Sequence, residues 1–460
     1  MMRRLFVLLK MFLIAGTVIV IAAGAVFVWY GIQHGWISRI FKQITIPVFT
    51  PTSTQFVSFE IPRFVQSDVL QKIHNQFIQE EASFIEADLS TLRLTVFHNG
   101  TAVKEVPIVA IGKQGSWWET PAGLYEIQTK EKNHLSGIGH VYMPYSMQFQ
   151  GNFFIHGWPY YPNGTEVESA FSGGCIRLRT ADARAIYDVI TIGMPLLVFK
   201  QELFNDTQWY GLRGPTINAQ AYLVADLKSN FVFTHKNIEA ELPIASVTKL
   251  ITSLVASEHV YLDGEIRIID PMLQKTSIPR LRLGERITAA DLFFPLLLES
   301  SNEAAYALAY GYYGGYDSFV GFLNKKAKAL GMEHTILVDP AGIGSGNMAT
   351  IRDLVYLAKY LYFNKSFILN ITASTADSLD YPPRFSDLKN LNMFAFDSEF
   401  RGGKIGKSST AQESMLAVFE MMLDGTRRPI VIVVLGSSDV TRDIDVLREY
   451  VREFHPIQAP

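Results

Sequence analysis

The sequence predicts a multidomain protein in which an N-terminal transmembrane helix precedes two compact domains. Three observations predict this arrangement. The chain has 460 residues, more than one hydrophobic core usually organises; an uncharged apolar run opens it; and turn-forming residues interrupt the pattern at 203–217. Apolar residues make up 48% of the chain and charged residues 18%, which is a globular balance. We therefore expect an anchor at 1–31, a spacer at 32–80, and domains at 81–202 and 218–460, with 203–217 as the linker.

The first thirty residues determine the expected compartment. No charged residue occurs from Met11 to Tyr30, and at about 1.5 Å per residue such a helix spans the roughly 30 Å of bilayer hydrocarbon. Arg3, Arg4 and Lys10 precede the run and favour a cytoplasmic N-terminus. We therefore expect a single-pass protein of the cell membrane whose domains lie on the outer face, periplasmic or extracellular.

A cleaved signal peptide, with Ala23-Gly24-Ala25 as its processing site, is the alternative. The anchor is favoured because the apolar run continues to Tyr30, beyond the length of a normal signal core. Both interpretations export the bulk of the chain. The spacer is expected to carry a short amphipathic helix near 69–79 and no chemistry.

Charge and histidine spacing argue against two classes of function. The formal net charge is -3, and no basic cluster is followed by spaced aromatic residues, so we expect no nucleic-acid partner. The ten histidines are scattered without the ligand spacing of a metal centre. We therefore expect neither a metal nor another cofactor.

Cys175 is the single cysteine of the chain, so it cannot form an intrachain disulfide. The ordinary interpretation of a lone cysteine is a small buried apolar residue. Here an apolar run delivers His156 to the end of an expected buried strand, and Gly173 and Gly174 let the backbone beside Cys175 approach a substrate. An imidazole that takes the thiol proton makes the nucleophilic thiolate, and adjacent backbone N–H groups would hold the oxyanion.

This pattern resembles the L,D-transpeptidase catalytic domain, in which a His-Gly pair precedes a Ser-x-Gly-Cys-x-Arg segment. The strand and turn at 94–100, the Thr-Pro-x-Gly turn at 120–123 and the closing strand at 195–199 also match. The resemblance implies a mainly-β L,D-transpeptidase domain at 81–202, with Cys175 as nucleophile and His156 as base. The substrate-binding residues that it implies are Gly157, Ser172, Gly174 and Arg177.

The resemblance implies attack on the bond between the third residue of a peptidoglycan stem, a diamino acid, and the D-alanine at position four. Cys175 would form a thioester and release D-alanine, and either an amine of a neighbouring stem or water would resolve the thioester. Arg177 is expected to bind a stem carboxylate or to form a structural ion pair. Many members carry histidine at the position of Gly173, which leaves the rate and the specificity open.

Ser246 and Lys249 stand three residues apart where Pro243 marks an expected helix start, so their side chains share one face of the helix. Serine is a poor nucleophile, and lysine serves as its base only if burial or positive charge lowers the lysine pKa. The spacing alone is expected by chance about once in a chain of this size, and an exposed helix pair is its ordinary interpretation.

Two later motifs strengthen the interpretation: Ser300-x-Asn302 at an expected helix boundary and Lys404 in a glycine-flanked strand. In this order the motifs resemble the serine penicillin-binding enzymes, especially the low-molecular-mass D-alanyl-D-alanine carboxypeptidases. The resemblance implies an α/β penicillin-binding/β-lactamase-like domain at 218–460. The roles that it implies are nucleophile for Ser246, base for Lys249, proton relay for Ser300, amide binding for Asn302 and carboxylate binding for Lys404.

The lysine motif departs from this family at Ile405, where a threonine or serine normally donates a hydrogen bond to the substrate carboxylate. Losing that bond costs about 1.5 to 3 kcal/mol, or roughly ten- to hundredfold in binding. Ser408 occupies the place of the family's second hydroxyl and is expected to compensate in part, so an active enzyme is favoured. The resemblance also implies an oxyanion hole made by the N–H groups of Ser246 and Lys407.

A D,D-carboxypeptidase leaves tetrapeptide stems, which an L,D-transpeptidase uses as acyl donors. We therefore expect a bifunctional peptidoglycan-remodelling enzyme that binds stem peptides and is inhibited by β-lactams. The alternative is an L,D-transpeptidase or L,D-carboxypeptidase whose serine domain is a non-catalytic wall-binding module. A β-lactamase is disfavoured because no convincing Glu-x-x-x-Asn deacylation loop occurs between Asn302 and Lys404. The chain ends soon after an expected helix at 440–454, so no further C-terminal β-domain is expected.

Overall fold

The computed structural model describes residues 66–453 apart from 115, 117, 138, 170, 201–214, 375–383 and 424. These residues all belong to one compact unit, which begins at Ile61. The predicted anchor at 1–31, most of the spacer at 32–80 and nearly all of the linker at 203–217 lie outside the described residues. Within the described ranges, no helix has both the length and the apolar character that a membrane span requires.

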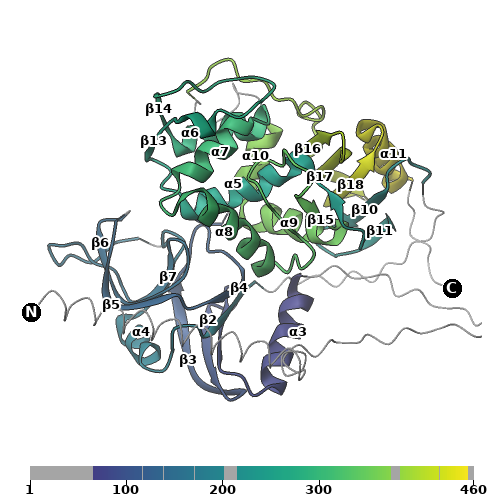
Figure 1. Ribbon diagram of the computed structural model, residues 1–460. Helices are drawn as coiled ribbons and strands as arrows, with labels where there is room; N and C mark the ends of the chain where they lie inside the picture. Colours follow the sequence, from purple (N-terminus) through teal and green to yellow (C-terminus); the bar gives the residue numbers. More distant parts are fainter. Residues whose placement is uncertain are drawn as a thin grey trace, which may run out of the picture. The chain divides into compact units, whose positions relative to one another are not determined.

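The first domain is built on one mixed β-sheet (Figure 1). Among the described residues this sheet has nine strands in the order β4-β9-β1-β2-β3-β8-β7-β6-β5. β1 is parallel to β9 and β7 is parallel to β8, whereas the other neighbours are antiparallel. The strands are β1 Phe84–Asp88, β2 Arg93–His98, β3 Thr101–Ala110, β4 Gly123–Glu126, β5 Thr129–Ser136, β6 Val141–Gln150, β7 Phe153–His156, β8 Ile176–Leu178 and β9 Pro195–Phe199.

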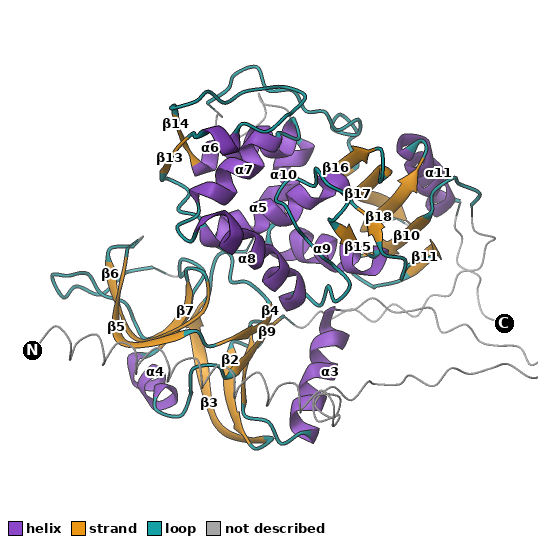
Figure 2. Ribbon diagram, in the orientation of Figure 1, coloured by secondary structure: helices purple, strands orange, loops and turns teal. Residues whose placement is uncertain are grey.

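Two helices pack on this sheet. α3 (Gln66–Gln79) contains the predicted amphipathic helix, and its Phe77 ring lies 5.1 Å from the ring of Phe84 in β1. α4 (Thr180–Tyr187) buries Ile186 in the core beneath the sheet. Figure 2 shows that strands dominate this domain, as the sequence predicts.

The second domain contains a five-stranded sheet within the described residues, in the order β11-β10-β18-β17-β16, and all its neighbours are antiparallel. Side chains alternate between its two faces. Val431 and Val433 of β18 join the cluster formed by the central helices, whereas Ile430 and Ile432 pack with α11 on the other face (Figure 1). The bounds are β10 Ala221–Asp226, β11 Val232–Lys236, β16 Phe400–Ser408, β17 Gln412–Leu423, β18 Thr426–Ser437 and α11 Val440–Arg452.

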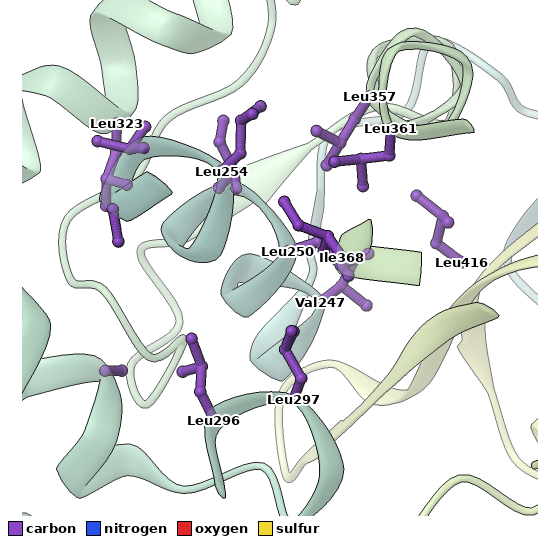
Figure 3. Close-up of a cluster of buried hydrophobic side chains, with 14 of the residues drawn as sticks. Val247, Leu250, Leu254, Leu296, Leu297, Leu323, Leu357, Leu361, Ile368 and Leu416 are labelled. Carbon is purple, nitrogen blue, oxygen red and sulfur yellow. The ribbon is translucent and has the colours of Figure 1, made fainter. Parts of the chain in front are cut away.

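A group of helices covers the inner face of this sheet, and α5 lies at its centre. All twelve residues of α5 are buried, as expected for a helix inside a core. Figure 3 shows Leu250 and Leu254 of α5 in one apolar cluster with Leu357 and Leu361 of α9. The helices are α5 Thr248–His259, α6 Ala289–Leu298, α7 Asn302–Gly311, α8 Gly315–Ala329, α9 Ile351–Asn364 and α10 Ser366–Ala373.

Short elements complete the domain. β12 (Leu242–Pro243) pairs with β15 (Met348–Ala349), β13 (Glu265–Arg267) pairs with β14 (Arg286–Thr288), and the 3₁₀ helices are η1 (Ala245–Val247) and η2 (Asp270–Met272).

The predicted helix start at Pro243 is wrong. Pro243 belongs to the short strand β12, where it lies opposite Met348, and the helical segment begins only at Ala245. Ala245 has a positive φ of 44°, which separates the strand from the helix. Backbone pairing with a segment about a hundred residues away, which no local pattern reveals, therefore decides the boundary.

Candidate active sites

Neighbouring parallel strands position His156 and Cys175. His156 is the last residue of β7, and Cys175 immediately precedes β8. In the register of these strands Ile155 lies opposite Ile176 and His156 lies opposite Arg177. Because side chains alternate along a strand, His156, Cys175 and Arg177 share one face, away from the core that contains Ile155 and Ile176. The structure thus brings the predicted base and nucleophile to the same part of the sheet.

The resting thiol, however, has another partner. Sγ of Cys175 donates to the carbonyl oxygen of Asn152 at 3.7 Å. The side chains of Cys175 and His156, both of which the structure describes, form no hydrogen bond with each other. Nδ1 of His156 donates to the carbonyl oxygen of Gly157 at 2.6 Å. That bond leaves Nε2 of a neutral imidazole as the proton acceptor.

Burial sets the protonation state of both groups. It lowers the pKa of His156 to about 4, opposed by the Gly157 hydrogen bond and reinforced by the positive charge of Arg177. Burial raises the pKa of Cys175 to about 11, opposed by a backbone hydrogen bond at Phe154 and by the charge of Arg177. The resting pair at neutral pH is therefore an uncharged thiol and an uncharged imidazole.

Gly174 and Ser172 shape the backbone around the thiol. Gly174 has φ +96°, and a Cβ there would lie 2.2 Å from the ring of Phe153, so only glycine fits. The hydroxyl of Ser172 donates to the carbonyl oxygen of Cys175, and its amide donates to Ile111 at 3.1 Å. Both predicted substrate-binding residues thus hold the turn before β8 in the resting structure.

Gly157 and Gly173 differ in their surroundings. A Cβ at Gly157 would lie 2.9 Å from Cα of Thr180, so this glycine permits close packing against the start of α4. A Cβ at Gly173 would meet no atom within 4 Å. The position where many L,D-transpeptidase domains carry histidine is therefore open enough for a side chain.

Arg177 holds the segment before Cys175 by hydrogen bonds and places a positive charge near the thiol. Its NH1 donates to the carbonyl of Ser169 at 2.8 Å, and its guanidinium lies 5.1 Å from the centroid of the Trp158 ring. Its Nε is buried without a hydrogen-bond partner among the described residues. Burial lowers its pKa, while the charge that Cys175 carries as a thiolate raises it. Arg177 therefore stabilises a thiolate at Cys175 when one forms.

In the second domain, Lys249 joins the predicted nucleophile to two other oxygen atoms. Its Nζ lies 2.9 Å from Oγ of Ser246, 2.8 Å from Oδ1 of Asn302 and 2.7 Å from the carbonyl oxygen of Ala341. Lys249 is fully buried in the first turn of α5. The spacing of three residues thus brings the two side chains into contact, as the sequence predicts.

The protonation state of Lys249 follows from this environment. Burial holds its pKa well below the usual value, and the nearby charge of Lys404 lowers it further, whereas Asp339 opposes the shift. A neutral amine has two N–H donors and one lone pair. If the donors serve Asn302 and Ala341, both of which offer only acceptors here, the lone pair accepts the proton of Ser246. Lys249 is then arranged as a general base.

Sequence reasoning missed how the third partner of Lys249 is fixed. Oδ1 of Asp339 accepts from the amides of Ala341 and Gly342 at 2.7 and 2.6 Å, and thereby folds the loop that presents the Ala341 carbonyl. Gly342 has φ +74°, and a Cβ there would lie 1.9 Å from the carbonyl oxygen of Ala245. The Asp-Pro-Ala-Gly run at 339–342 therefore holds a hydrogen-bond partner of the predicted base.

Ser300 lies between α6 and α7, and Asn302 is the first residue of α7. Ser300 adopts φ +59°, a conformation that costs a non-glycine residue about 1 to 3 kcal/mol, and within the described part of the chain its hydroxyl makes no hydrogen bond. Asn302 donates from Nδ2 to the carbonyl oxygen of Lys275 at 2.7 Å while its Oδ1 accepts from Lys249. The structure therefore places Asn302 directly on the base and leaves the Ser300 hydroxyl without a protein partner.

Strand β16 brings Lys404 and its neighbours to the site. Lys404 is buried, donates to the carbonyl oxygen of Ile405 at 3.2 Å, and has a pKa that burial lowers to about 8. A Cβ on Gly406 would lie 2.9 Å from the amide nitrogen of Ser246, so the strand backbone passes beside the nucleophile. Ser408 lies at the end of β16, where its hydroxyl accepts from the amide of Ala411 at 2.9 Å.

Ile405 and Ser408 are the two positions that bear on carboxylate binding. Ile405 packs against the cluster that includes α11, on the sheet face opposite the central helices. The structure does not bring the Ser408 hydroxyl into contact with Ser246, Lys249 or Lys404. Ser408 thus supports the turn between β16 and β17, and its predicted role in carboxylate binding remains a prediction.

No group of three or more histidine, cysteine, aspartate or glutamate side chains in the described ranges has the arrangement of a metal site.

Comparisons with known families match both domains. The chain belongs to the D-alanyl-D-alanine carboxypeptidase family, whose model matches residues 210–439, half of the chain. A second model, the L,D-transpeptidase catalytic domain, matches residues 82–198. Both families predicted from the sequence motifs are confirmed, and the chain is a multidomain protein of mixed α and β content.

Individual relatives match part of the chain. The chain is 36% identical over 146 residues to the D-alanyl-D-alanine endopeptidase of Escherichia coli K12, covering 31% of this chain and 47% of the relative. It is 32% identical over 200 residues to that of Haemophilus influenzae, covering 43% and 68%. The chain spans about half the length of the endopeptidases from Escherichia coli and Pseudomonas aeruginosa. A crystal structure of D-alanyl-D-alanine carboxypeptidase from Mycobacterium tuberculosis H37Rv matches with a TM-score of 0.47 and 25% identity, covering 55% of this chain and 97% of that one.

Alkylation of Cys175 by iodoacetamide tests the protonation state of the thiol. Because burial raises the pKa of the thiol, the alkylation rate of the native protein is expected to rise with pH to a midpoint near 11. In urea the midpoint is expected at about 8.5, the value of a free cysteine. The readout is specific because the chain has one cysteine. A native midpoint at or below neutral pH would instead indicate a preformed thiolate and imidazolium pair.

The pH dependence of penicillin binding tests Lys404. Its charge is present below its pKa of about 8 and is lost above it, so attraction for the penicillin carboxylate should weaken as pH rises through 8. We expect the second-order acylation rate of Ser246 to fall roughly ten- to hundredfold between pH 7 and 10. Lys404→Gln should react slowly with no such fall. A wild-type rate that stays constant to pH 10 contradicts this role for Lys404.

Proposed function

We propose that this chain is a peptidoglycan-remodelling enzyme with two acyl-transfer sites, a D,D-carboxypeptidase at Ser246 and an L,D-transpeptidase at Cys175. The observation that carries the proposal is the buried Lys249, whose Nζ lies 2.9 Å from the Ser246 hydroxyl and whose pKa is held well below its usual value. A buried base touching a serine, in a chain of this family, supports catalysis over a purely binding role.

At the serine site, Lys249 takes the Ser246 proton as Oγ attacks the carbonyl of the D-alanyl-D-alanine bond. The terminal D-alanine leaves with that proton, Ser300 relays it, and water then hydrolyses the ester to release a tetrapeptide stem. Lys404 attracts the terminal carboxylate, and β-lactams acylate Ser246 in place of the stem. The free hydroxyl of Ser300 and the lowered pKa of Lys249 support these roles.

At the cysteine site, His156 takes the thiol proton as Sγ of Cys175 attacks the carbonyl beside the fourth D-alanine of a tetrapeptide. D-alanine leaves with that proton, and an amine of a neighbouring stem or water resolves the thioester. The neutral imidazole and the charge of Arg177, which stabilises a forming thiolate, support this sequence. Since the resting thiol contacts Asn152, attack requires Sγ to turn toward the substrate.

The location of these reactions follows from the start of the sequence. The uncharged run from Met11 to Tyr30, after Arg3 and Arg4, supports a membrane anchor that holds both domains on the outer face, where peptidoglycan lies.

A second candidate for the serine domain is D-alanyl-D-alanine endopeptidase activity. The relatives at 36% and 37% identity carry that name. Such an enzyme opens a bond within the wall rather than at the end of a stem, so cross-linked dimers would be lost instead of pentapeptides.

Muropeptide analysis of pentapeptide-rich sacculi tests both activities. We expect Ser246→Ala to abolish the loss of pentapeptides and Cys175→Ala to abolish the consumption of tetrapeptides, each by about a thousandfold or more. Each variant serves as the control for the other. Fluorescent penicillin should label the wild type and Cys175→Ala but not Ser246→Ala. A wild-type protein that takes no label and leaves pentapeptides intact would indicate that the serine domain only binds the wall.

Joining the two sites on one chain should matter for pentapeptide substrates. The serine domain makes the acyl donor beside Cys175, so the local donor concentration is raised. We expect the wild type to make products of Cys175 faster than an equimolar mixture of full-length Ser246→Ala and Cys175→Ala, each of which retains one site. On tetrapeptide the two samples, matched in active Cys175, should perform alike. Equal rates on pentapeptide would contradict the advantage of fusion.

A further inference from the structure

The turn between β6 and β7 in the first domain is held by the second domain. Nε2 of Gln150 donates to Nε2 of His259 at 2.7 Å and to Oε2 of Glu258 at 3.3 Å. Gly151 lies so close to the last turn of α5 that a Cβ would come within 2.5 Å of the carbonyl oxygen of Glu258. Gln150, Glu258 and His259 are all buried, so these contacts form a closed interface within one compact unit.

A buried ion pair lies beneath this contact. Lys326 of α8 and Glu258 of α5 are 2.9 Å apart and fully buried, and Nζ of Lys326 also lies 3.0 Å from the hydroxyl of Tyr125 in β4. Removing either ion would leave the other buried without its ion-pair partner, which is strongly destabilising. The first domain supplies Tyr125 and Gln150, which hydrogen-bond to the two ions. The position of the first domain against α5 is therefore specified by these polar contacts as well as by shape.

The same turn contacts the thiol. The carbonyl oxygen of Asn152, two residues after Gln150, accepts the hydrogen bond of Cys175 Sγ. The ring of Phe153 occupies the space against which Gly174 packs, and Nζ of Lys365 in the second domain lies 5.4 Å from the centroid of that ring. Residues on both sides of Asn152 are thus fixed by side chains of the serine domain.

α5 connects this contact with the serine site. Lys249 lies in its first turn and Glu258 and His259 end it, roughly 14 Å apart along the axis at about 1.5 Å per residue. The helix is buried on every side, so its two ends cannot move independently of the core.

We propose that Gln150 and His259 are positioning residues of the cysteine site, and that the end of α5 completes this site by holding the Asn152 carbonyl against the Cys175 thiol. The serine domain then has a second role, independent of its own chemistry, as part of the scaffold of the other active site. This role rests on the proposed function of Cys175 as the nucleophile. Gln150 and His259 touch neither substrate nor thiol and act through Asn152.

The test uses full-length protein carrying His259→Phe, because every residue of the first domain then stays native. Phenylalanine keeps the ring contact with Phe322, whose ring centroid lies 4.2 Å from that of His259. It removes one of the two acceptors of Gln150. His235→Phe, at an exposed histidine of β11, is the matched control. Gln150→Ala tests the same contact from the other domain. Its control is Gln114→Ala, since among the described residues the side chain of Gln114 makes a single, exposed hydrogen bond, to the carbonyl oxygen of Phe363 at 3.4 Å.

Two readouts follow Cys175. In His259→Phe and Gln150→Ala the iodoacetamide midpoint should move down from about 11 by about one pH unit or more, because a loosened turn exposes the thiol. In a Ser246→Ala background, release of D-alanine from tetrapeptide should fall about tenfold in kcat with little change in KM, since the nucleophile is misplaced while substrate binding remains. Both controls should match the parent protein in both readouts.

The outcomes separate the inference from the proposed function. Alkylation needs no turnover, so an unchanged midpoint in both variants, with normal penicillin labelling of Ser246, overturns the inference even if Cys175 proves catalytic. A shifted midpoint in a parent protein that never releases D-alanine supports the positioning role and contradicts the proposed activity. If His259→Phe loses Ser246 labelling, the serine domain has been disrupted and Gln150→Ala decides.

Discussion

Burial of Lys249 without a carboxylate partner is the constraint on which the serine site depends. Its three hydrogen-bond partners are a hydroxyl, an amide oxygen and a backbone carbonyl, and none of them carries a charge. An ammonium ion in such a place is costly, so burial holds the pKa of Lys249 well below its usual value, and the charge of Lys404 lowers it further. The apolar side chains around α5 therefore contribute to the low pKa of Lys249, because they bury its side chain. Packing and chemistry are inseparable in this helix.

The cysteine site uses the same physical effect with a different result. Burial disfavours both the thiolate of Cys175 and the imidazolium of His156, so the resting pair is neutral. In the proposed reaction, proton transfer therefore accompanies attack, and the nearby charge of Arg177 compensates the thiolate as it forms. A neutral, buried thiol is also a poor target for oxidation, which follows thiolate character and exposure. For a single cysteine in a chain expected to be exported, this protection has clear value.

Local sequence patterns were sufficient for the parts of the site that local structure builds. Periodicity and motif order predict three of these parts: the strand that ends at His156, the contact between Ser246 and Lys249, and the glycine-flanked strand of Lys404. The partners that turn these residues into sites come from elsewhere. The Ala341 carbonyl lies 92 residues from Lys249 in the chain, and backbone carbonyls have no sequence signature. For that reason sequence reasoning did not find this partner.

The misplaced helix start has the same origin. Pro243 has the pattern of a helix start, but pairing with Met348 draws it into a strand. Pro243 satisfies a local rule, and a tertiary contact decides its role. Side-chain type therefore predicts what a residue can do, whereas its partners determine what it does.

The buried pair of Glu258 and Lys326 bears on why the two domains share one compact unit. Such a pair adds little net stability, because desolvation offsets most of its attraction. It strongly disfavours other arrangements, however, since a displaced domain would remove Gln150 and Tyr125 from buried polar groups that then lack partners. A flexible linker alone would suffice to raise the local concentration of a product. The buried polar interface includes Gln150, two residues before Asn152, whose carbonyl oxygen accepts the hydrogen bond of Cys175 Sγ. Such an interface fixes the position of the thiol, and a nucleophile requires a fixed position.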